Sequence, residues 1–325
     1  VEVIKGPSSS MFGSGLGGTI LLYPSKPPAG NIRLTQKNTF GSWGLFRNTT
    51  GVTHSGEKTR IGMAYNKTHS DGYRENNAYD RSDVVTMLDF YPNRRHTFTL
   101  LALYIDVKAY IPSSIDSMDF VNNPSAAAPS WKATRGFEDY RRLLSGISHQ
   151  YDIRRDLTLK TAVFGGSRNN YELRPFNVLK ERNHNLGLRS FLKYTPVIRK
   201  VKTSIVLGGE YFNEKYAWNT FENNEREPGA MLSDNEEVRM YYNLFLQSTF
   251  HLTTKLSFHA GLNMNSTTYN YSDLYLSNGD QSGNHRFQPV FSPRIAVSYD
   301  VNPGLFLYGN ISHGFSPPGL EETLT

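Results

Sequence analysis

The sequence predicts an all-β fold, a transmembrane antiparallel β-barrel, and three observations support this prediction. Apolar and polar residues alternate with a period of two over long stretches, which indicates strands with one apolar and one polar face. Short and long connections alternate along the chain, which is typical of membrane barrels with tight turns on one rim and long loops on the other. The 325 residues include 20 tyrosines and 19 phenylalanines, yet the mean hydropathy is −0.50. A polar interior combined with aromatic interfaces explains such a composition.

Composition excludes several other classes of protein. No run of 18 apolar residues occurs, so a transmembrane helix is excluded. The absence of cysteine excludes disulfide scaffolds, thiol catalysis and thiolate metal sites. The formal charge of +6 favours anionic ligands or lipid headgroups but does not inform the fold. Composition alone does not separate a membrane barrel from a soluble all-β protein.

The first element is a pair of short strands, Val1 to Ile4 and Thr19 to Tyr23, around a turn and a small-residue loop. This loop contains G-x-G-x-x-G at residues 13–18, the pattern of a dinucleotide-binding turn. That turn needs a following helix and an acidic residue about 20 positions later. The chain instead continues to Pro24, Pro27 and Pro28, which cannot continue a helix, and has Asn38 near the acidic position. The dinucleotide interpretation is therefore rejected.

The same stretch resembles the end of the plug domain of TonB-dependent outer-membrane receptors. The matching parts are VEVIKGP at residues 1–7, the serines at 8–10, FGSG at 12–15 and GGTI at 17–20. Small residues at these places let the backbone pass close to a surrounding wall. The resemblance implies that residues 1–29 are the end of a plug and its linker, and that residues 30–325 belong to a transmembrane barrel.

The period-2 strands follow in order. In the clearest one, between Glu237 and Leu252, apolar residues from Val238 to Leu252 alternate with mostly polar ones, and similar alternation occurs after Val201 and between Lys255 and Asn265. Short connections are predicted at 54–57, 92–96, 152–156, 196–200, 252–255 and 300–304. Outer loops are predicted at 41–44, 70–80, 107–137, 168–182, 213–236 and 266–291. This pattern gives about 13 strands, the last at Leu305 to His313.

The end of the sequence also resembles this receptor family. Residues 307–323, LYGNISHGFSPPGLEET, are similar to a segment in the middle of such a barrel. Barrels of this family close with about 22 strands, and lipid does not tolerate open sheet edges. We therefore expect the chain to be a fragment, with most of the plug and the last part of the barrel missing.

No enzyme is predicted. The sequence lacks a G-x-S-x-G elbow, an H-E-x-x-H motif and a Walker loop. The nine histidines are scattered singly, and the oxygen-rich segment 273–284 lacks the EF-hand order, so no metal site or cofactor is expected.

The resemblance implies that a ligand meets the outer loops, where cations and aromatic residues recognise it. We expect the ligand-binding candidates to be Tyr73, Arg74, Tyr79, Trp131, Lys132, Arg135, Arg168, Tyr171, Arg174, Trp218, Tyr271, Tyr275, His285 and Arg286. For each of them alone, a solvated loop residue or an interface aromatic is the competing interpretation.

The resemblance also implies a latch between plug and barrel. Lys5 occupies the basic position before Gly-Pro, and Glu321 or Glu322 could supply the carboxylate. A buried pair of this kind would hold the plug, because loss of one partner leaves an unpaired charge. The alternative is that Lys5 points into a wet lumen.

The function that the resemblance implies is TonB-dependent uptake of a scarce nutrient across the bacterial outer membrane, with a ferric siderophore as the leading substrate. Haem, cobalamin, another metal chelate and an oligosaccharide stay open as substrates. The expected partners are TonB, through an upstream segment, the chelate and outer-membrane lipid, with no nucleic acid and a monomeric protein. A passive porin or fatty-acid-type channel with a short N-terminal hatch is the alternative; an outer-membrane enzyme or adhesin lacks support in the sequence.

Overall fold

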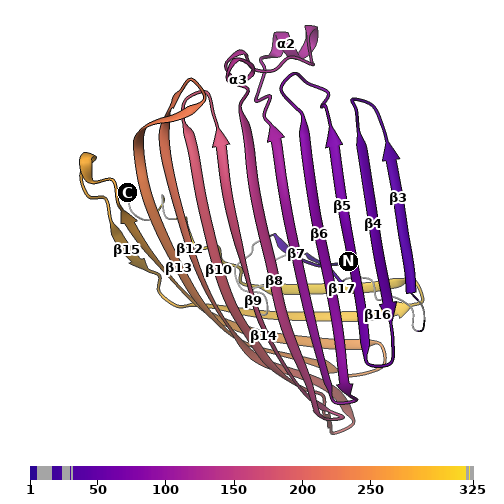
Figure 1. Cartoon of the computed structure of the whole chain (residues 1–325). Coiled ribbons are helices and arrows are strands. Elements are labelled where there is room, and N and C mark those ends of the chain that lie inside the picture. The colour runs from indigo at the N-terminus through magenta and orange to yellow at the C-terminus, as the bar shows by residue number, and fades with distance from the viewer. Residues whose placement is uncertain (6–16, 24–29, 31, 320–321, 323–325) are drawn as a thin grey trace.

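One curved antiparallel sheet dominates the computed structural model, which describes residues 1–5, 17–23, 30, 32–319 and 322 (Figure 1). Within these residues, thirteen strands pair in chain order, each with the next. They are β3 Ile32–Phe40, β4 Phe46–Ser55, β5 Thr59–Ser70, β6 Tyr79–Asn93, β7 His96–Tyr110, β8 Phe137–Arg154, β9 Leu157–Leu173, β10 Val178–Tyr194, β12 Val201–Asn224, β13 Glu227–His251, β14 Leu256–Asp273, β16 Val290–Asn302 and β17 Leu305–Ser312. The predicted all-β antiparallel fold and its strand count are confirmed.

Several short elements accompany this sheet. β1 (Glu2–Lys5) and β2 (Gly18–Leu21) pair with each other in a separate two-stranded sheet. The others are β11 Val197–Ile198, β15 Gly283–Arg286, the helices α2 Ser117–Asn122 and α3 Pro129–Thr134, and the 3₁₀ helix η1 Leu276–Asn278. Neither described helix has the length and apolar character needed to cross a membrane. The domain boundary between residues 29 and 30 stays a prediction.

The longest connections between strands all lie at one end of the sheet. Each predicted short connection overlaps the turn between two long strands, although the strands are longer than predicted: the turns are at 56–58 between β4 and β5 and at 94–95 between β6 and β7, for example. We call their side of the sheet the turn rim. The opposite side, which we call the loop rim, carries the connections at 71–78 and 111–136, the latter with α2 and α3 (Figure 1).

Three of the predicted long loops are partly or largely strand. The segment 168–182 is largely strand, because β9 continues to Leu173 and β10 begins at Val178. The segment 213–236 is a tall hairpin, in which β12 and β13 are separated only by Glu225 and Arg226, both with positive φ. The loop predicted at 266–291 is shortened in the same way, since β14 extends to Asp273 and β15 pairs with it.

Burial in the sheet is the reverse of that in a water-soluble protein. Cross-strand partners point to the same face of a sheet, so the register defines an outer and an inner face. Large apolar side chains on the outer face are exposed: Leu100, Ile147, Val163, Leu188, Leu207, Leu244 and Leu262 are 37–57% exposed. Polar side chains on the inner face are buried, among them Asp83, Asp89, Asn170, Asn243, Asn263, Asn265 and Thr267, at 0–8% exposure. A lipid-facing wall around a polar interior has this arrangement.

Aromatic residues border the exposed apolar zone of the outer face. Toward the turn rim, Phe98 stacks on His149 with ring centroids 4.4 Å apart. Toward the loop rim, Tyr211 lies 5.3 Å from Tyr242. We call the apolar zone between these aromatic residues the belt. Aromatic girdles of this kind are typical of membrane interfaces.

The β1–β2 pair lies on the inner side of the curved sheet (Figure 1). Tyr23, just after β2, lines a cavity of about 380 Å³ together with inner-face residues such as Leu101 and Phe164. The N-terminal strands are thus placed against the polar interior rather than against the belt.

Candidate functional site

The loops at 71–78 and 111–136 form one folded unit on the loop rim. Arg74 donates from Nε to the carbonyl oxygen of Ala126 at 2.9 Å, and from a terminal nitrogen to that of Ser113 at 2.7 Å. Asn76 donates from Nδ2 to the carbonyls of Ile111 at 2.8 Å and Gly136 at 3.0 Å. Both side chains therefore hold the longer loop through its backbone.

Glu75, between Arg74 and Asn76 in the sequence, also contacts the longer loop. Lys132 Nζ lies 2.6 Å from Glu75 Oε1, and the backbone N–H of Ala127 donates to Glu75 Oε2 at 3.3 Å. The hydrogen bond from Lys132, and then that from Ala127, hold the pKa of Glu75 below its ordinary value. Arg74 and Lys132, predicted to bind ligand, are thus both engaged within the loop unit.

The helices of the longer loop are fixed by local contacts. Asp116 caps α2 by accepting the backbone N–H of Asp119 at 2.8 Å. α3 begins with Pro129 and is followed by Arg135 in the left-handed conformation. The Trp131 ring covers Gly136 so closely that a Cβ there would lie 2.4 Å from it. The tip of the β12–β13 hairpin also reaches the unit, since Arg226 donates to the carbonyl of Ala133 at 3.0 Å.

Below this unit, the inner face carries a network of aromatic rings and carboxylates. Tyr216 stacks on Trp218 at 4.9 Å between centroids, and Trp218 lies 6.0 Å from Tyr271. Glu181, on the neighbouring strand β10, accepts a short hydrogen bond from the Tyr216 hydroxyl and another from Asn170 Nδ2 at 2.6 Å. The aromatic faces and acceptors of three strands therefore meet on one part of the wall.

Ion pairs extend the network along the wall. Arg168 lies 2.5 Å from Glu138, and Arg239 lies 2.6 Å from Glu214. A cavity of about 160 Å³ opens between them, lined by residues including Arg142, Arg168, Glu181, Glu214 and Tyr216. Such a surface offers stacking, hydrogen bonds and charges of both signs to a polar ligand.

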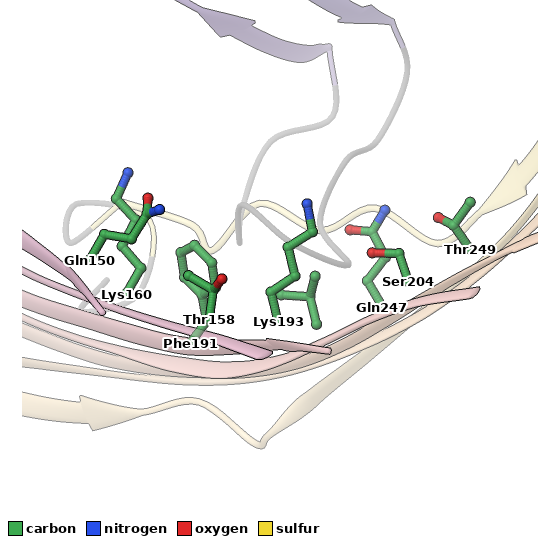
Figure 2. A pocket seen from close by; sticks show the side chains of 9 residues that line it. Gln150, Thr158, Lys160, Phe191, Lys193, Ser204, Gln247 and Thr249 are labelled. Carbon is green, nitrogen blue, oxygen red and sulfur yellow. The ribbon is translucent and has the colours of Figure 1, made fainter. Parts of the chain in front are cut away.

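A second, larger cavity lies on the inner face toward the turn rim (Figure 2). It measures about 430 Å³ and is lined by Gln150, Thr158, Lys160, Phe191, Lys193, Ser204, Val206, Gln247 and Thr249. Figure 2 shows Lys160 and Lys193 pointing away from the sheet, toward the side on which β1 and β2 lie. No described carboxylate lies within 4.0 Å of either lysine, so this part of the interior is positively charged.

The structure places the other predicted ligand-binding residues in several environments. Arg168, Trp218 and Tyr271 lie on the inner face of strands rather than on loops. Tyr171 is also on a strand, but its register partners Asp139 and Lys180 place it on the outer face. Tyr73 packs edge-on against Trp43 at 5.2 Å, and Arg174 pairs with Glu172 at 2.5 Å. The rest are Tyr79 at the start of β6, Arg135 beside the Tyr110 ring, Tyr275 before η1, and His285 and Arg286 on β15.

These positions correct the expectation that all the candidates are loop residues, while their role in ligand binding stays a prediction. The latch stays a prediction as well, because the side chain of Lys5 and all of Glu321 fall outside the described residues. Glu322 is exposed, and its carboxylate accepts the backbone N–H of Gly319 at 2.8 Å.

Sequence reasoning missed the carboxylates and partners that organise the inner wall, namely Glu138, Glu181, Glu210, Glu214, Tyr216 and Arg239. Glu181, Glu214 and Tyr216 lie in segments predicted as loops, whereas Glu210 and Arg239 lie on the polar faces of predicted strands, where their alternation with outward-facing residues was the available signal. Their pairing depends on which strands are neighbours and in what register, which a single sequence does not reveal. Among the described residues, no group of three or more His, Asp or Glu side chains is placed to hold a metal ion.

Comparison with known proteins gives one family and several solved structures. The family description that matches, "TonB dependent receptor-like, beta-barrel", covers residues 93–325. The ferric-catecholate import receptor Fiu from E. coli K12 and the siderophore receptor PiuA from Acinetobacter baumannii both superpose with a TM-score of 0.80 at 14% identity over 97% of this chain. The alcaligin outer-membrane receptor FauA from Bordetella pertussis gives a TM-score of 0.77 at 13% identity over 97% of this chain. The chain spans 59%, 54% and 49% of those three structures.

Proposed function

We propose that this chain, which belongs to the TonB-dependent receptor-like β-barrel family, takes part in TonB-driven uptake of a ferric siderophore or similar iron chelate across the bacterial outer membrane. Uptake of this kind uses energy transmitted by TonB and involves no covalent chemistry on the substrate. The protein would be a monomer in the outer membrane, in contact with TonB, its chelate and lipid.

The observation that carries the proposal is the reversed burial of the sheet. Asn243 is 3% exposed on the inner face, while the next residue, Leu244, is 56% exposed on the outer face. In water, the exposed leucines would be unfavourable, whereas in a bilayer they face hydrocarbon. The family match supports an energised receptor over a passive porin with a short hatch.

We infer that the chelate first contacts the loop rim and the inner wall below it. The stack of Tyr216, Trp218 and Tyr271 offers aromatic faces, and the adjacent Arg168 and Arg142 offer charge-assisted hydrogen bonds to an anionic chelate. The folded loop unit lies at the mouth of this wall. Iron chelates lead among the candidate substrates because the solved structures of similar fold include receptors for such ligands.

Growth under iron limitation tests this proposal. A strain that lacks its other siderophore receptors would carry the complete gene for this protein and receive catecholate, hydroxamate and citrate chelates of iron in turn, with haem and cobalamin as separate tests. We expect at least one iron chelate to restore growth, and deletion of tonB to abolish that growth. Uptake that persists without TonB would replace the proposal with the passive-channel alternative.

A further inference from the structure

A hollow of about 440 Å³ lies on the outer face of the sheet, outside the wall described above. Its lining includes Asp139, Arg141, Tyr171, Lys180, Arg182 and Asn219 from β8, β9, β10 and β12. The register places these side chains on the outer face in two adjacent rows, because Arg141 and Arg182 both face Asn169, while Asp139 and Lys180 both face Tyr171. The hollow therefore opens away from the interior.

The hollow lies directly beyond the belt on the loop side. Along β8, the outward residues that precede Arg141 from the turn rim are Ile147, Ser145 and Leu143. Along β10, in the same direction, the outward residues are Leu186, His184 and then Arg182. Two residues advance a strand by about 6.6 Å, so Arg141 lies one such step beyond Leu143 and Arg182 lies two such steps beyond Leu186. This is the height at which a headgroup region begins in a bilayer.

Two cations of the hollow, Lys180 and Arg182, have no carboxylate within 4.0 Å among the described residues. Two carboxylates contribute to the lining, Asp139 and Glu181, but Glu181 is engaged by the Tyr216 hydroxyl and Asn170 Nδ2. Arg141 lies 3.5 Å from Asp106 and is 67% exposed. Elsewhere on the outer face, Lys215 pairs with Glu236 at 2.7 Å and Lys67 pairs with Asp80 at 3.6 Å.

The side chains in the hollow are also suited to hold a ligand in place. Lys180 Nζ lies over the rings of Phe221 at 4.9 Å and Tyr171 at 5.9 Å, which orients the ammonium group. Arginine presents a planar fork of donors that matches phosphate, and lysine adds a point charge. Asn169 and Asn219 supply amide groups in the same lining.

We propose that this hollow binds the phosphate-bearing headgroup of a lipid in the leaflet that surrounds the loop rim. The inference rests on the proposed membrane location, but not on which substrate is transported. Basic pockets at the edge of a membrane-spanning wall bind anionic headgroups, because the lipid tails pack on the apolar surface below while the cations neutralise phosphate. Here the tails would lie along Leu143, Leu186 and Leu188, all at least 44% exposed.

Binding of a diphosphorylated lipid A to the purified, delipidated full-length protein tests the proposal. Native mass spectrometry would count bound lipid, and titration would give its apparent affinity. We expect the double variant Lys180→Gln/Arg182→Gln to bind lipid A at least about tenfold more weakly, because two phosphate contacts are lost. The matched control is Lys215→Gln, which removes one outer-face lysine that Glu236 already neutralises and should change binding little.

Further measurements separate the possible sources of phosphate. Removing both phosphates from the lipid should reduce its binding to wild type to the level of the double variant. Equal binding by wild type and double variant would overturn the proposal. Displacement of lipid A by millimolar inorganic phosphate would assign the hollow to a free anion instead. Heat-modifiable gel mobility verifies that each variant is folded. Chelate uptake is measured separately, so that a failure of lipid binding is distinguished from a failure of the proposed transport function.

Discussion

Individual residues in this protein take environments opposite to those they take in water-soluble proteins. Asn263 and Asn265 on β14 are 0% and 5% exposed, while Leu262, the residue before Asn263 on the same strand, is 44% exposed on the outer face. Buried side-chain amides are usually hydrogen-bonded: Asn265 donates from Nδ2 to Asn243 Oδ1 at 2.8 Å, whereas the amide of Asn263 has no hydrogen-bond partner among the described residues. The inner wall is therefore held by polar contacts between strands, as the ion pairs of Glu214 and Glu210 also show.

At the residue scale, Glu75→Gln should loosen the loop at 111–136. The hydrogen bond from Lys132 holds the pKa of Glu75 below its ordinary value, so the carboxylate is charged and its contact is fully formed at neutral pH. A depressed folded-state pKa contributes stability above the unfolded pKa, and this contribution is lost as the pH falls through the folded value. Hydrogen exchange of residues 111–136 should thus be faster in the variant at pH 7, and the difference from wild type should shrink at acid pH, as the pH falls through the lowered pKa of Glu75.

Glu57→Gln is the control for that experiment. Glu57 is exposed in the turn between β4 and β5, on the opposite rim, and has no ion pair within the described structure. Its substitution should leave exchange in the loop unchanged at both pH values. A Glu75 variant that behaves like the Glu57 variant at pH 7 would contradict the prediction.

At the scale of elements, the sequence was sufficient for the strand count and the turns but not for the height of the strands. Within the belt, alternation of apolar and polar residues identifies a strand directly. Beyond the belt, both faces of a strand are polar, as in residues Arg168 to Glu172 of β9. Apolar and polar residues no longer alternate there, so the sequence of this segment resembles that of a loop. What keeps this segment extended is its pairing with β8 and β10, through contacts such as Arg168–Glu138 and Asn170–Glu181.

Part of the candidate site could be predicted from the sequence, and part could not. Trp218 and Tyr271 were found because aromatic residues among polar ones stand out in any segment. Glu181 and Glu214 were not, because a carboxylate is ordinary in a presumed loop and becomes informative only when the register brings Tyr216 or Arg239 beside it.

Two neighbouring residues on β7, one on each face of the sheet, allow a test of which face contacts lipid. Leu100 and Leu101 are adjacent on β7 and similarly exposed, at 37% and 44%, but they point to the outer and the inner face. Leu100→Arg should lower the free energy of unfolding in lipid vesicles by about 2–4 kcal/mol, because the charge enters the hydrocarbon region. Leu101→Arg should have a much smaller effect, since it faces a cavity that also contains Asp89.

Urea titration of both variants in the same vesicles measures this difference. In a soluble sandwich the two substitutions would have similar consequences. Equal losses of stability for the two variants would therefore contradict the assignment of the outer face to lipid.

At the scale of the whole molecule, the sorting of loops and turns predicts an orientation in the membrane. The loop rim should face the outside of the cell and the turn rim the periplasm, because outer-membrane barrels have long extracellular loops and short periplasmic turns. The N-terminal strands lie on the inner side of the sheet, where a plug would lie (Figure 1).

Single cysteines test this orientation cleanly, because the sequence contains no cysteine of its own. Met118 in α2 is 69% exposed on the loop rim, and Glu57 is exposed on the turn rim. A maleimide on a polyethylene glycol too large to cross the outer membrane should label Met118→Cys in intact cells. It should label Glu57→Cys only after the membrane is permeabilised. The reverse pattern would invert the proposed orientation.

The way in which Arg74 and Asn76 hold the long loop has an evolutionary consequence. Both side chains donate to backbone carbonyls of residues 111–136, which every amino acid carries. The hydrogen bonds of Arg74 and Asn76 therefore do not depend on the side chains of most residues in the loop. Exposed residues such as Met118, Phe120 and Val121 are free to diversify under pressure from antibodies, phages or toxins, while the loop keeps its shape.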